Sequence, residues 1–390
     1  MKKIQMVDLK GQYEKIKDQV QQGFDNVLSS TAFINGPEVH TFQSELEEYL
    51  GVKHVIPCAN GTDALQIAMM GLGLQPGDEV ITADFTFAAT VEVIALLQLT
   101  PVLVDVLPDT FNIDPDAIEK AITPKTKAIV PVHLFGQIAD MDRIMEIAEK
   151  HQLFVIEDNA QGIGSSYQVN SETRQKTGTI GHVGSTSFFP SKNLGCYGDG
   201  GAIFTNDDEL AHTIRGIVNH GMYTRYHHDV VGVNSRLDSL QATVLRVKLP
   251  HLDSYNQTRR QVANQYTTAF KGYEAIITPY IVGNKCDTNH KTTCKTCDCH
   301  VFHQYTLQVK NIDRDQLVEY LNNHDIPCGV YYPIPLHKQK AYQDERYQEK
   351  DFTITNQLVT NVISLPMHTE LDNDQIEFIT SKVIEFIEGK

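Results

Sequence analysis

The sequence predicts an α/β protein with a mostly parallel central sheet, followed by a smaller α+β domain at the C-terminal end. Short, continuous apolar runs alternate with segments of helical spacing between residues 54 and 157, a pattern typical of a parallel sheet covered by helices on both faces. After Pro250 the pattern changes to a long polar helix and more widely spaced elements. We therefore expect a large domain over 1–250 and a small domain over 251–390.

The apolar spacing places each element in turn. Two helices come first, at 8–30 and 39–50, with a turn at Asn35-Gly36-Pro37 between them. The alternating region then gives strands at 54–58, 79–82, 101–105, 128–132 and 153–157, and helices at 62–71, 88–97, 115–121 and 141–151. The C-terminal part gives helices at 252–270, 313–323 and 374–387, and strands at 301–309 and 328–332.

Composition narrows the class of protein. A formal net charge of -16 argues against nucleic acid as a partner, because that would need a broad basic face. The start of the chain does not read as a signal peptide, and no apolar run is long enough to predict a membrane span. The odd number of cysteines, seven, fits a reducing compartment without a disulfide framework, so we expect a cytoplasmic protein.

Ligands of parallel sheets bind beyond the carboxyl ends of the strands, so the residues that follow each strand are the candidates. After the first strand, Gly61 and Thr62 open a helix whose free amides form a cradle for an anion. Plain helix capping by Asn60 or Thr62 would explain the same residues. Asp158 follows the strand at 153–157, and Phe87 lies in the loop after the strand at 79–82.

A lysine stands in the most unusual stretch of the chain. Lys192 lies between an apolar run that ends at Phe189 and a glycine cluster over 195–201. A solvated lysine in a hairpin turn is the alternative to a reactive amine. Read together, however, an anion cradle, a strand-end carboxylate, an aromatic ring and a lysine are the parts that hold pyridoxal 5'-phosphate (PLP). Ser187, five residues before the lysine, could add a contact to the phosphate.

These motifs resemble, in order, those of the DegT/DnrJ/StrS family of PLP-dependent nucleotide-sugar aminotransferases, which have the aspartate aminotransferase type of fold (fold type I). The matching stretches are 59–65, 156–161, 187–194, 198–201 and 232–242. The resemblance implies that Lys192 forms the internal aldimine and that Asp158 contacts the ring nitrogen. Gln161 would lie near the cofactor hydroxyl, Phe87 would stack on the ring, and Gly61, Thr62 and Ser187 would hold the phosphate.

The resemblance also implies partners. Asn234 matches an asparagine that reaches the cofactor phosphate of the neighbouring subunit, which implies a homodimer with shared active sites. The most similar branch of the family uses L-glutamate to aminate C3 of UDP-2-acetamido-2-deoxy-3-oxo-D-glucuronate, for bacterial surface polysaccharides such as O-antigen. Tyr331 and Tyr332 fall in its substrate region, although Tyr331 stands where close relatives carry histidine, and Asn193 where proline is expected.

Arg236 is the candidate for a carboxylate or diphosphate of the substrate, because a guanidinium fork suits both. An ion pair with Asp238 or another acid is the structural alternative.

Two other functions remain open, and a third lacks its motif. The protein could aminate another keto-sugar, such as a dTDP-3-oxo or UDP-4-oxo sugar, or be an inactive PLP-binding regulator. A nicotinamide-dependent oxidoreductase would need a Gly-x-Gly-x-x-Gly turn after the first strand, which the chain lacks.

A cysteine-rich insertion covers residues 284–300. Its cysteines could close a tetrahedral zinc site, but its lysine and threonine content fits an exposed insertion equally well. We expect no metal, and a zinc site here is the less favoured alternative. The four cysteines concerned are Cys286, Cys294, Cys297 and Cys299.

Overall fold

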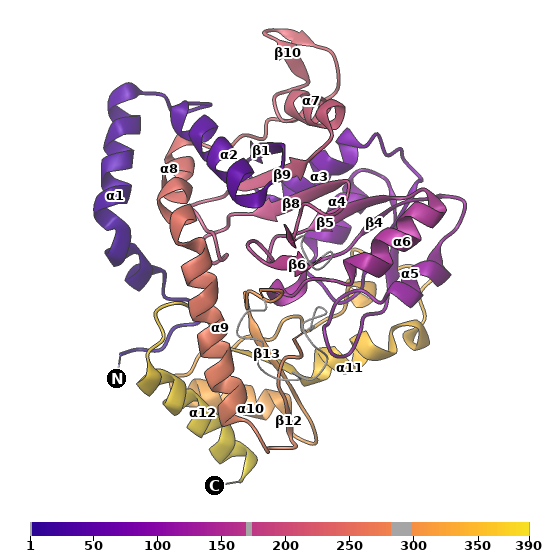
Figure 1. Cartoon of the computed structure of the whole chain (residues 1–390). Coiled ribbons are helices and arrows are strands. Elements are labelled where there is room, and N and C mark those ends of the chain that lie inside the picture. The colour runs from indigo at the N-terminus through magenta and orange to yellow at the C-terminus, as the bar shows by residue number, and fades with distance from the viewer. Residues whose placement is uncertain (1, 169–173, 282–297, 390) are drawn as a thin grey trace.

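The centre of the molecule is a seven-stranded sheet with the strand order β1-β9-β8-β5-β4-β2-β3 (Figure 1). The computed structural model describes residues 2–168, 174–281 and 298–389. Only β9 runs antiparallel to its neighbours, and the other adjacent pairs are parallel, so the predicted mostly parallel sheet is confirmed. The strands are β1 (His54–Cys58), β2 (Glu79–Ala83), β3 (Thr100–Val104), β4 (Thr126–Val130), β5 (Phe154–Asp158), β8 (Val183–Ser187) and β9 (Gly201–Thr205).

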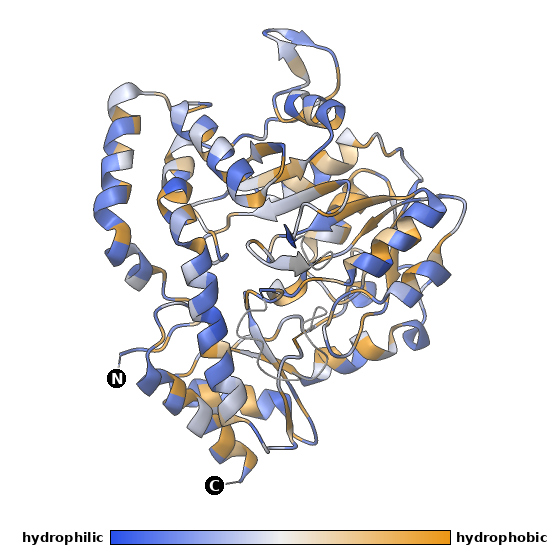
Figure 2. Cartoon of the chain, in the orientation of Figure 1, coloured by the Kyte–Doolittle hydropathy of each residue, from blue (hydrophilic) through white to orange (hydrophobic). Residues whose placement is uncertain are grey.

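Helices cover both faces of this sheet because alternate strand residues point to opposite sides. Ile81 and Val155 face one core cluster, which also contains residues of α5 and α6, whereas Val80 and Ile156 face another, with residues of α3 and α7. Figure 2 shows β8 in pale, nearly neutral colours, and helices such as α1 and α6 with both polar and apolar residues. The helices of this region are α1 (Leu9–Ser30), α2 (Pro37–Leu50), α3 (Gly61–Gly71), α4 (Ala89–Leu96), α5 (Pro115–Ala121), α6 (Met141–His151), α7 (Asp208–Ile217) and α8 (Ser239–Lys248).

Two short two-stranded sheets accompany the large sheet. The strands β6 (Ser166–Gln168) and β7 (Arg174–Lys176) pair with each other, as do β10 (Met222–Thr224) and β11 (His227–His228). The second hairpin projects from the body of the molecule beyond α7 (Figure 1).

The C-terminal region forms its own α+β layer. The long helix α9 (Leu252–Ala269) connects the large sheet region to this C-terminal region. Both ends of the chain lie near the C-terminal region (Figure 1). Its antiparallel sheet has the order β12-β13-β14 and packs with α10 and α12 around a separate core cluster, whereas the buried apolar residues of α11 belong to the cluster that contains α5 and α6. The elements are β12 (Ile276–Ile277), β13 (Tyr305–Val309), β14 (Val362–Leu365), α10 (Arg314–Asn323), α11 (Thr353–Asn361) and α12 (Asn373–Ile387). The expected domain boundary at residue 250 stays a prediction.

Two expected strands of this region differ from the structure. The strand predicted at 301–309 begins only at Tyr305, because Val301 N donates to the carbonyl of Gly136 (2.9 Å) and not to the small sheet. The strand predicted at 328–332 is wrong. Gly329 makes a single bridge to Ser364, and the chain then turns toward the large sheet.

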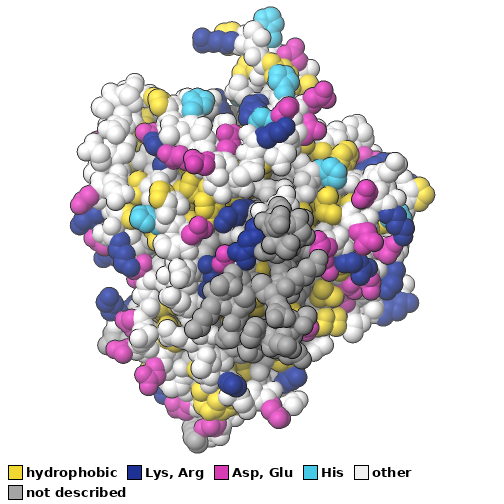
Figure 3. All heavy atoms as spheres, in the orientation of Figure 1, with side chains coloured by type: hydrophobic (Ala, Val, Ile, Leu, Met, Phe, Trp, Pro, Cys, Tyr) yellow, Lys and Arg dark blue, Asp and Glu magenta, His cyan; other side chains and the backbone are white. Residues whose placement is uncertain are grey.

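In the described part of the chain, no helix combines the length and apolarity needed to cross a bilayer. Acidic and basic side chains are interspersed over the face shown in Figure 3.

Of the cysteine-rich insertion, Cys286, Cys294 and Cys297 lie outside the described residues. Cys299 is fully buried in the core cluster beneath the sheet. Within the described ranges, no group of three or more histidine, cysteine or acidic side chains could hold a metal ion.

A buried carboxylate holds the end of β5 in place. The Glu157 side chain is fully buried and accepts hydrogen bonds from the backbone N–H groups of Gly178 (2.7 Å), Ile180 (2.6 Å) and Gly181 (2.6 Å). It also contacts the His133 ring, with 2.8 Å between Oε2 and Nε2. Because Asp158 is the next residue, this cluster fixes the position of the strand end where the candidate site lies.

Replacing Glu157 should therefore destabilise the fold. Glu157→Ala leaves these donors buried without an acceptor, and we expect a loss of about 3–5 kcal/mol in the free energy of unfolding. Urea denaturation followed by circular dichroism measures this loss. Glu149→Ala, which removes an exposed carboxylate from α6, is the matched control and should change stability by less than about 0.5 kcal/mol. Equal stability of the two variants would contradict the role given to Glu157.

Candidate active site

Several predicted site residues lie at the carboxyl ends of β1, β2, β5 and β8, along one edge of the large sheet. Asn60 to Thr62 follow β1, Phe87 follows β2, Asp158 ends β5 and Ser187 ends β8. Strands β5 and β8 are adjacent and parallel, with Asp158 paired to Ser185. Residues far apart in the sequence are therefore brought to one edge, as expected for a parallel sheet.

The turn between β1 and α3 is shaped to hold an anion. A Cβ placed on Gly61 would lie 2.6 Å from the Ser187 Cβ, and one on Gly201 would lie 2.4 Å from the Asn60 carbonyl oxygen. Both positions therefore need glycine. The Asn60 side chain caps α3 by accepting from Asp63 N (2.8 Å), so the capping alternative is correct for Asn60. Among the described residues, the N–H groups of Gly61 and Thr62 have no acceptor, so they remain available to an anion.

Asp158 is held as a fixed, buried carboxylate. Its side chain accepts from the Thr90 hydroxyl (2.8 Å) and from Ala160 N (3.1 Å), and the residue is 5% exposed. Thr90 lies in the first turn of α4, so that helix orients the carboxylate. A carboxylate fixed by two donors can hold a proton on a basic nitrogen of a ligand.

Lys192 is partly buried, in contrast to the solvated lysine considered as an alternative. Burial lowers its pKa from the usual 10.5 to about 8, while the negative charge of Asp158 partly opposes this shift. The carboxylate and the amine therefore interact electrostatically across the site. An amine with a pKa near 8 is neutral often enough at physiological pH to act as a nucleophile.

Aromatic side chains line the same region. The ring of Phe87 is 57% exposed and lies 6.2 Å, centroid to centroid, from that of Tyr332. The Tyr332 hydroxyl accepts from Gln161 Nε2 (3.1 Å), whose Oε1 in turn accepts from Phe135 N (2.7 Å). Burial raises the pKa of Tyr332, so its hydroxyl stays protonated. The structure thus brings Phe87, Gln161 and Tyr332 together, and Tyr331 is their half-buried neighbour.

Asn234 and Arg236 stand apart from this group. Their segment lies beside the β1–α3 turn, because Ser235 Oγ accepts from Ala59 N (3.0 Å). The Asn234 side chain is exposed, and Arg236 is partly buried. Within the part of the chain that the structure describes, neither side chain has a hydrogen-bond or ion-pair partner, so the alternative of an Arg236–Asp238 ion pair is wrong.

Sequence reasoning missed a buried acid–imidazole pair at the rim of the site. Asp84 accepts from His337 N (2.7 Å) and contacts His337 Nδ1 (2.6 Å), and burial raises the pKa of Asp84 to about 6. The pair joins the loop that carries Phe87 to the one that carries Tyr332. Asp84 directly follows β2, so the strand-end rule that identified Asp158 could have found it. No local signal marked His337 as its partner.

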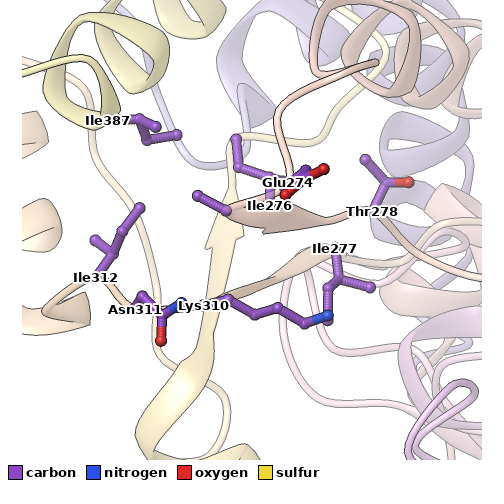
Figure 4. A pocket seen from close by; sticks show the side chains of 9 residues that line it. Glu274, Ile276, Ile277, Thr278, Lys310, Asn311, Ile312 and Ile387 are labelled. Atoms are coloured by element: carbon purple, nitrogen blue, oxygen red, sulfur yellow. The ribbon is translucent and has the colours of Figure 1, made fainter.

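A hollow elsewhere on the molecule is not lined by residues with this chemistry. It has a volume of about 800 Å³ and lies beside β12, between Glu274, Lys310 and Ile387 (Figure 4). None of the predicted site residues lines it.

The residues at the carboxyl edge fit PLP. The cradle has unpaired N–H groups at a helix N-terminus and two positions that only glycine fills, which suits a phosphate group. A fixed carboxylate, an exposed aromatic ring and an amine of lowered pKa complete the set of groups that this cofactor needs. The fold and the site together define a PLP-dependent enzyme of fold type I.

Comparisons with known proteins identify the family. The chain belongs to the DegT/DnrJ/EryC1/StrS aminotransferase family, whose model matches residues 14–384. It is therefore a PLP-dependent aminotransferase, and the resemblance seen in the sequence is confirmed. Over 96% of this chain and 98% of the relative, it is 47% identical to the UDP-2-acetamido-2-deoxy-3-oxo-D-glucuronate aminotransferase of Pseudomonas aeruginosa.

Two further relatives widen the comparison. A protein of Geobacillus stearothermophilus called a pleiotropic regulatory protein is 44% identical over 98% of both chains. The crystal structure of NtdA from Bacillus subtilis with bound cofactor PMP is 31% identical, with a TM-score of 0.85, over 96% of this chain and 82% of that one.

The lowered pKa of Lys192 predicts a distinctive reactivity. An amine is reactive only when neutral, and at pH 8 about half of a group with a pKa near 8 is neutral, against less than about 1% of an ordinary lysine. We expect acylation of Lys192 in the cofactor-free chain to rise with an apparent pKa near 8. Brief acetylation across a pH series, with mass spectrometry of peptides, measures this value. Exposed Lys125 is the internal reference, and an equal pH dependence for both lysines would contradict the prediction.

Proposed function

We propose that this protein transfers the amino group of L-glutamate to C3 of UDP-2-acetamido-2-deoxy-3-oxo-D-glucuronate. The observation that carries the proposal is the combination of an intact PLP site with 47% identity, over nearly the whole chain, to an aminotransferase named for this substrate. The product would be an amino sugar nucleotide for bacterial surface polysaccharides such as O-antigen. The cysteine usage of the sequence supports a cytoplasmic location.

Each predicted residue has a role in this proposal. PLP supplies an electron sink and carries the amino group between donor and acceptor. Gly61 and Thr62 donate their N–H groups to its phosphate, and the Ser187 hydroxyl adds a further contact. Phe87 packs on the ring, and Gln161 lies near its hydroxyl.

The acid–base chemistry belongs to two residues. Asp158 would lie beside the pyridine nitrogen, where its carboxylate can hold the proton of that nitrogen. Lys192 would hold the cofactor through its amine. When free, that amine would remove the proton from the α-carbon of glutamate, and in the second half of the reaction it would deliver a proton to C3 of the sugar. Burial suits this task because it keeps the pKa of the amine near 8.

Arg236 is the proposed contact for the uronate carboxylate or the diphosphate. Its guanidinium is partly buried and has no ion-pair partner among the described residues, which leaves it available to an anion. Tyr331 and Tyr332 are the proposed sugar contacts, because they belong to the group of aromatic side chains that line the site.

A panel of keto-sugar nucleotides tests the substrate assignment. With glutamate as donor, we expect the UDP-3-oxo-uronate to have a kcat/KM at least about tenfold above dTDP-3-oxo and UDP-4-oxo sugars, since only it offers a carboxylate to Arg236. Arg236→Lys keeps the charge and loses the fork. It should raise KM for the uronate alone if Arg236 binds the carboxylate, and for every substrate of the panel if it binds the diphosphate. Preference for a dTDP-3-oxo or UDP-4-oxo sugar would support the alternative aminotransferase function.

A regulatory protein without turnover is the alternative of another class, and the name of the Geobacillus relative gives a reason to test it. The presence of Lys192, Asp158 and Asn234 supports catalysis instead, because a regulator without turnover would be expected to have lost at least one of them. Absence of turnover over the whole panel, with cofactor bound, would favour the regulator.

We further propose a homodimer in which Asn234 contributes to the partner's site. Large apolar side chains such as Phe33, Tyr226 and Val231 are 43%, 76% and 85% exposed, as expected for a surface that another subunit covers. The Asn234 side chain is itself exposed and makes no hydrogen bond to the described residues of its own chain.

Mixing two inactive variants tests the shared site. If Asn234 acts across the dimer, a mixed dimer of Lys192→Ala and Asn234→Ala chains contains one site with both native residues. Equal mixing under conditions of subunit exchange should then restore about a quarter of the native activity, because half of the dimers are mixed. The measurement is specific activity after mixing, with each variant alone as control. No recovery despite proven exchange would place Asn234 in the site of its own chain.

A further inference from the structure

The loop that carries Lys192 has little regular structure of its own. Between β8 and β9, its described backbone bonds include those from Lys192 N to the Phe189 carbonyl and from Cys196 N to the Phe188 carbonyl, both 2.8 Å. The position of the lysine therefore depends on side chains that hold the loop from outside.

Helix α8 holds the part of the loop after the lysine. Lys248 Nζ donates to the Gly195 carbonyl (2.7 Å), and Gln241 Oε1 accepts from Tyr197 N (2.9 Å). Both contacts lie three or more residues beyond Lys192. A separate contact holds the loop next to the lysine itself.

That contact is the side-chain amide of Asn193. Its Nδ2 donates to Asn256 Oδ1 on α9 (2.7 Å) and to the Val301 carbonyl (3.0 Å), so both of its protons are used. Its Oδ1 lies 3.3 Å from Nδ1 of His303. Asn193, Asn256 and His303 are 5%, 1% and 7% exposed. A buried network whose members are all satisfied favours one arrangement over its alternatives.

The partners of Asn193 are themselves fixed. Asn256 Nδ2 donates to the Ile163 carbonyl (3.2 Å), which ties α9 to the segment after β5. Val301 N donates to the Gly136 carbonyl (2.9 Å), and Gln304 N donates to the Phe135 carbonyl (3.3 Å). The amide of Asn193 therefore joins the lysine loop to two rigid supports, one of which leads into the C-terminal region.

The network also sets the state of His303. Because Oδ1 of Asn193 can only accept, the proton of the imidazole belongs on Nδ1, and Nε2 keeps its lone pair. Burial and the positive charges of Lys192 and Arg259 lower the pKa of His303 well below its usual value. The ring is thus neutral and adds no positive charge beside the amine. Among the described residues, Asp158 and His303 are titratable groups that interact electrostatically with Lys192 from the elements around it.

We propose that Asn193 is a positioning residue, whose amide fixes the Lys192 amine relative to Asp158 by tying the lysine loop to α9 and to residues 301–303. The inference rests on the role proposed above for Lys192. A displacement of about 1 Å at a reacting group can cost about a hundredfold in rate, so a direct neighbour of the lysine has strong leverage. A proline at this position would lack the amide, and the network could not form.

The test compares Asn193→Ala with Asn264→Ala, which removes an exposed asparagine from α9. In the cofactor-free full chain, the pH dependence of Lys192 acetylation reports the surroundings of the amine. We expect Asn193→Ala to raise its apparent pKa from about 8 by at least about one unit, because a loosened loop exposes the amine to water. In the holoenzyme, kcat should fall at least tenfold, with KM for both substrates changed less than threefold.

Asn256→Ala provides a second variant if Asn193→Ala does not fold. It removes one of the two acceptors of the Asn193 amide, together with the bond from α9 to the Ile163 carbonyl, but leaves the bond from Asn193 to Val301, so both readouts should move in the same direction by a smaller amount. The control Asn264→Ala should leave both unchanged. The acetylation readout needs no turnover, so it tests the positioning role even if the proposed aminotransferase reaction is wrong. An unchanged acetylation pKa with unchanged kcat, in whichever of the two network variants folds, would overturn the proposal and leave Asn193 a purely structural residue.

Discussion

The site depends on keeping one amine partly out of water beside one fixed carboxylate. Burial disfavours the charged form of Lys192, whereas the negative charge of Asp158 favours it, and burial has the larger effect. If the amine were fully solvated, it would be almost entirely protonated at neutral pH. If the carboxylate were mobile, it could not hold a proton at a defined atom. The surrounding structure meets both requirements, because α4 supplies a donor to Asp158 and the loops around Lys192 exclude solvent from it.

The fold meets these requirements with contacts between distant segments. The parallel strands bring Gly61, Asp158 and Ser187 to one edge of the sheet, although nearly 100 residues separate the first two. The acid–imidazole pair of Asp84 and His337 and the amide of Asn193 then attach the C-terminal region to that edge. The C-terminal region therefore helps to determine where site residues lie, in addition to lining one side of the site.

Much of this could be predicted from the sequence, because its signals are local. Alternating apolar runs identified five of the seven strands of the large sheet to within about two residues, all except β8 and β9, and the strand-end rule pointed to Asp158 and Gly61. The strand predicted at 328–332 was wrong for a physical reason. Its apolar residues pack against the core cluster that contains Phe85 and Phe135, and they do not join the small sheet. A sequence pattern cannot distinguish these two kinds of burial.

The contacts that hold the site in place could not be predicted, because each joins residues that are far apart in the chain. Nothing near Asn193 indicates that its amide meets Asn256 and Val301, and nothing near Asp84 indicates His337. The roles of Asn234 and Arg236 stay predictions for a related reason, since their side chains are satisfied by no described residue of this chain.

The most direct test of the account is to find which lysine carries the cofactor. Borohydride reduction of the holoenzyme, followed by proteolysis and mass spectrometry, fixes the cofactor to the residue that holds it. The account predicts a single labelled peptide with the cofactor on Lys192. Lys248 is a demanding comparison, because burial lowers its pKa to about 8 as well, but its amine is bonded to the Gly195 carbonyl. Cofactor found on Lys248 or on any other lysine, or on none, would contradict the account.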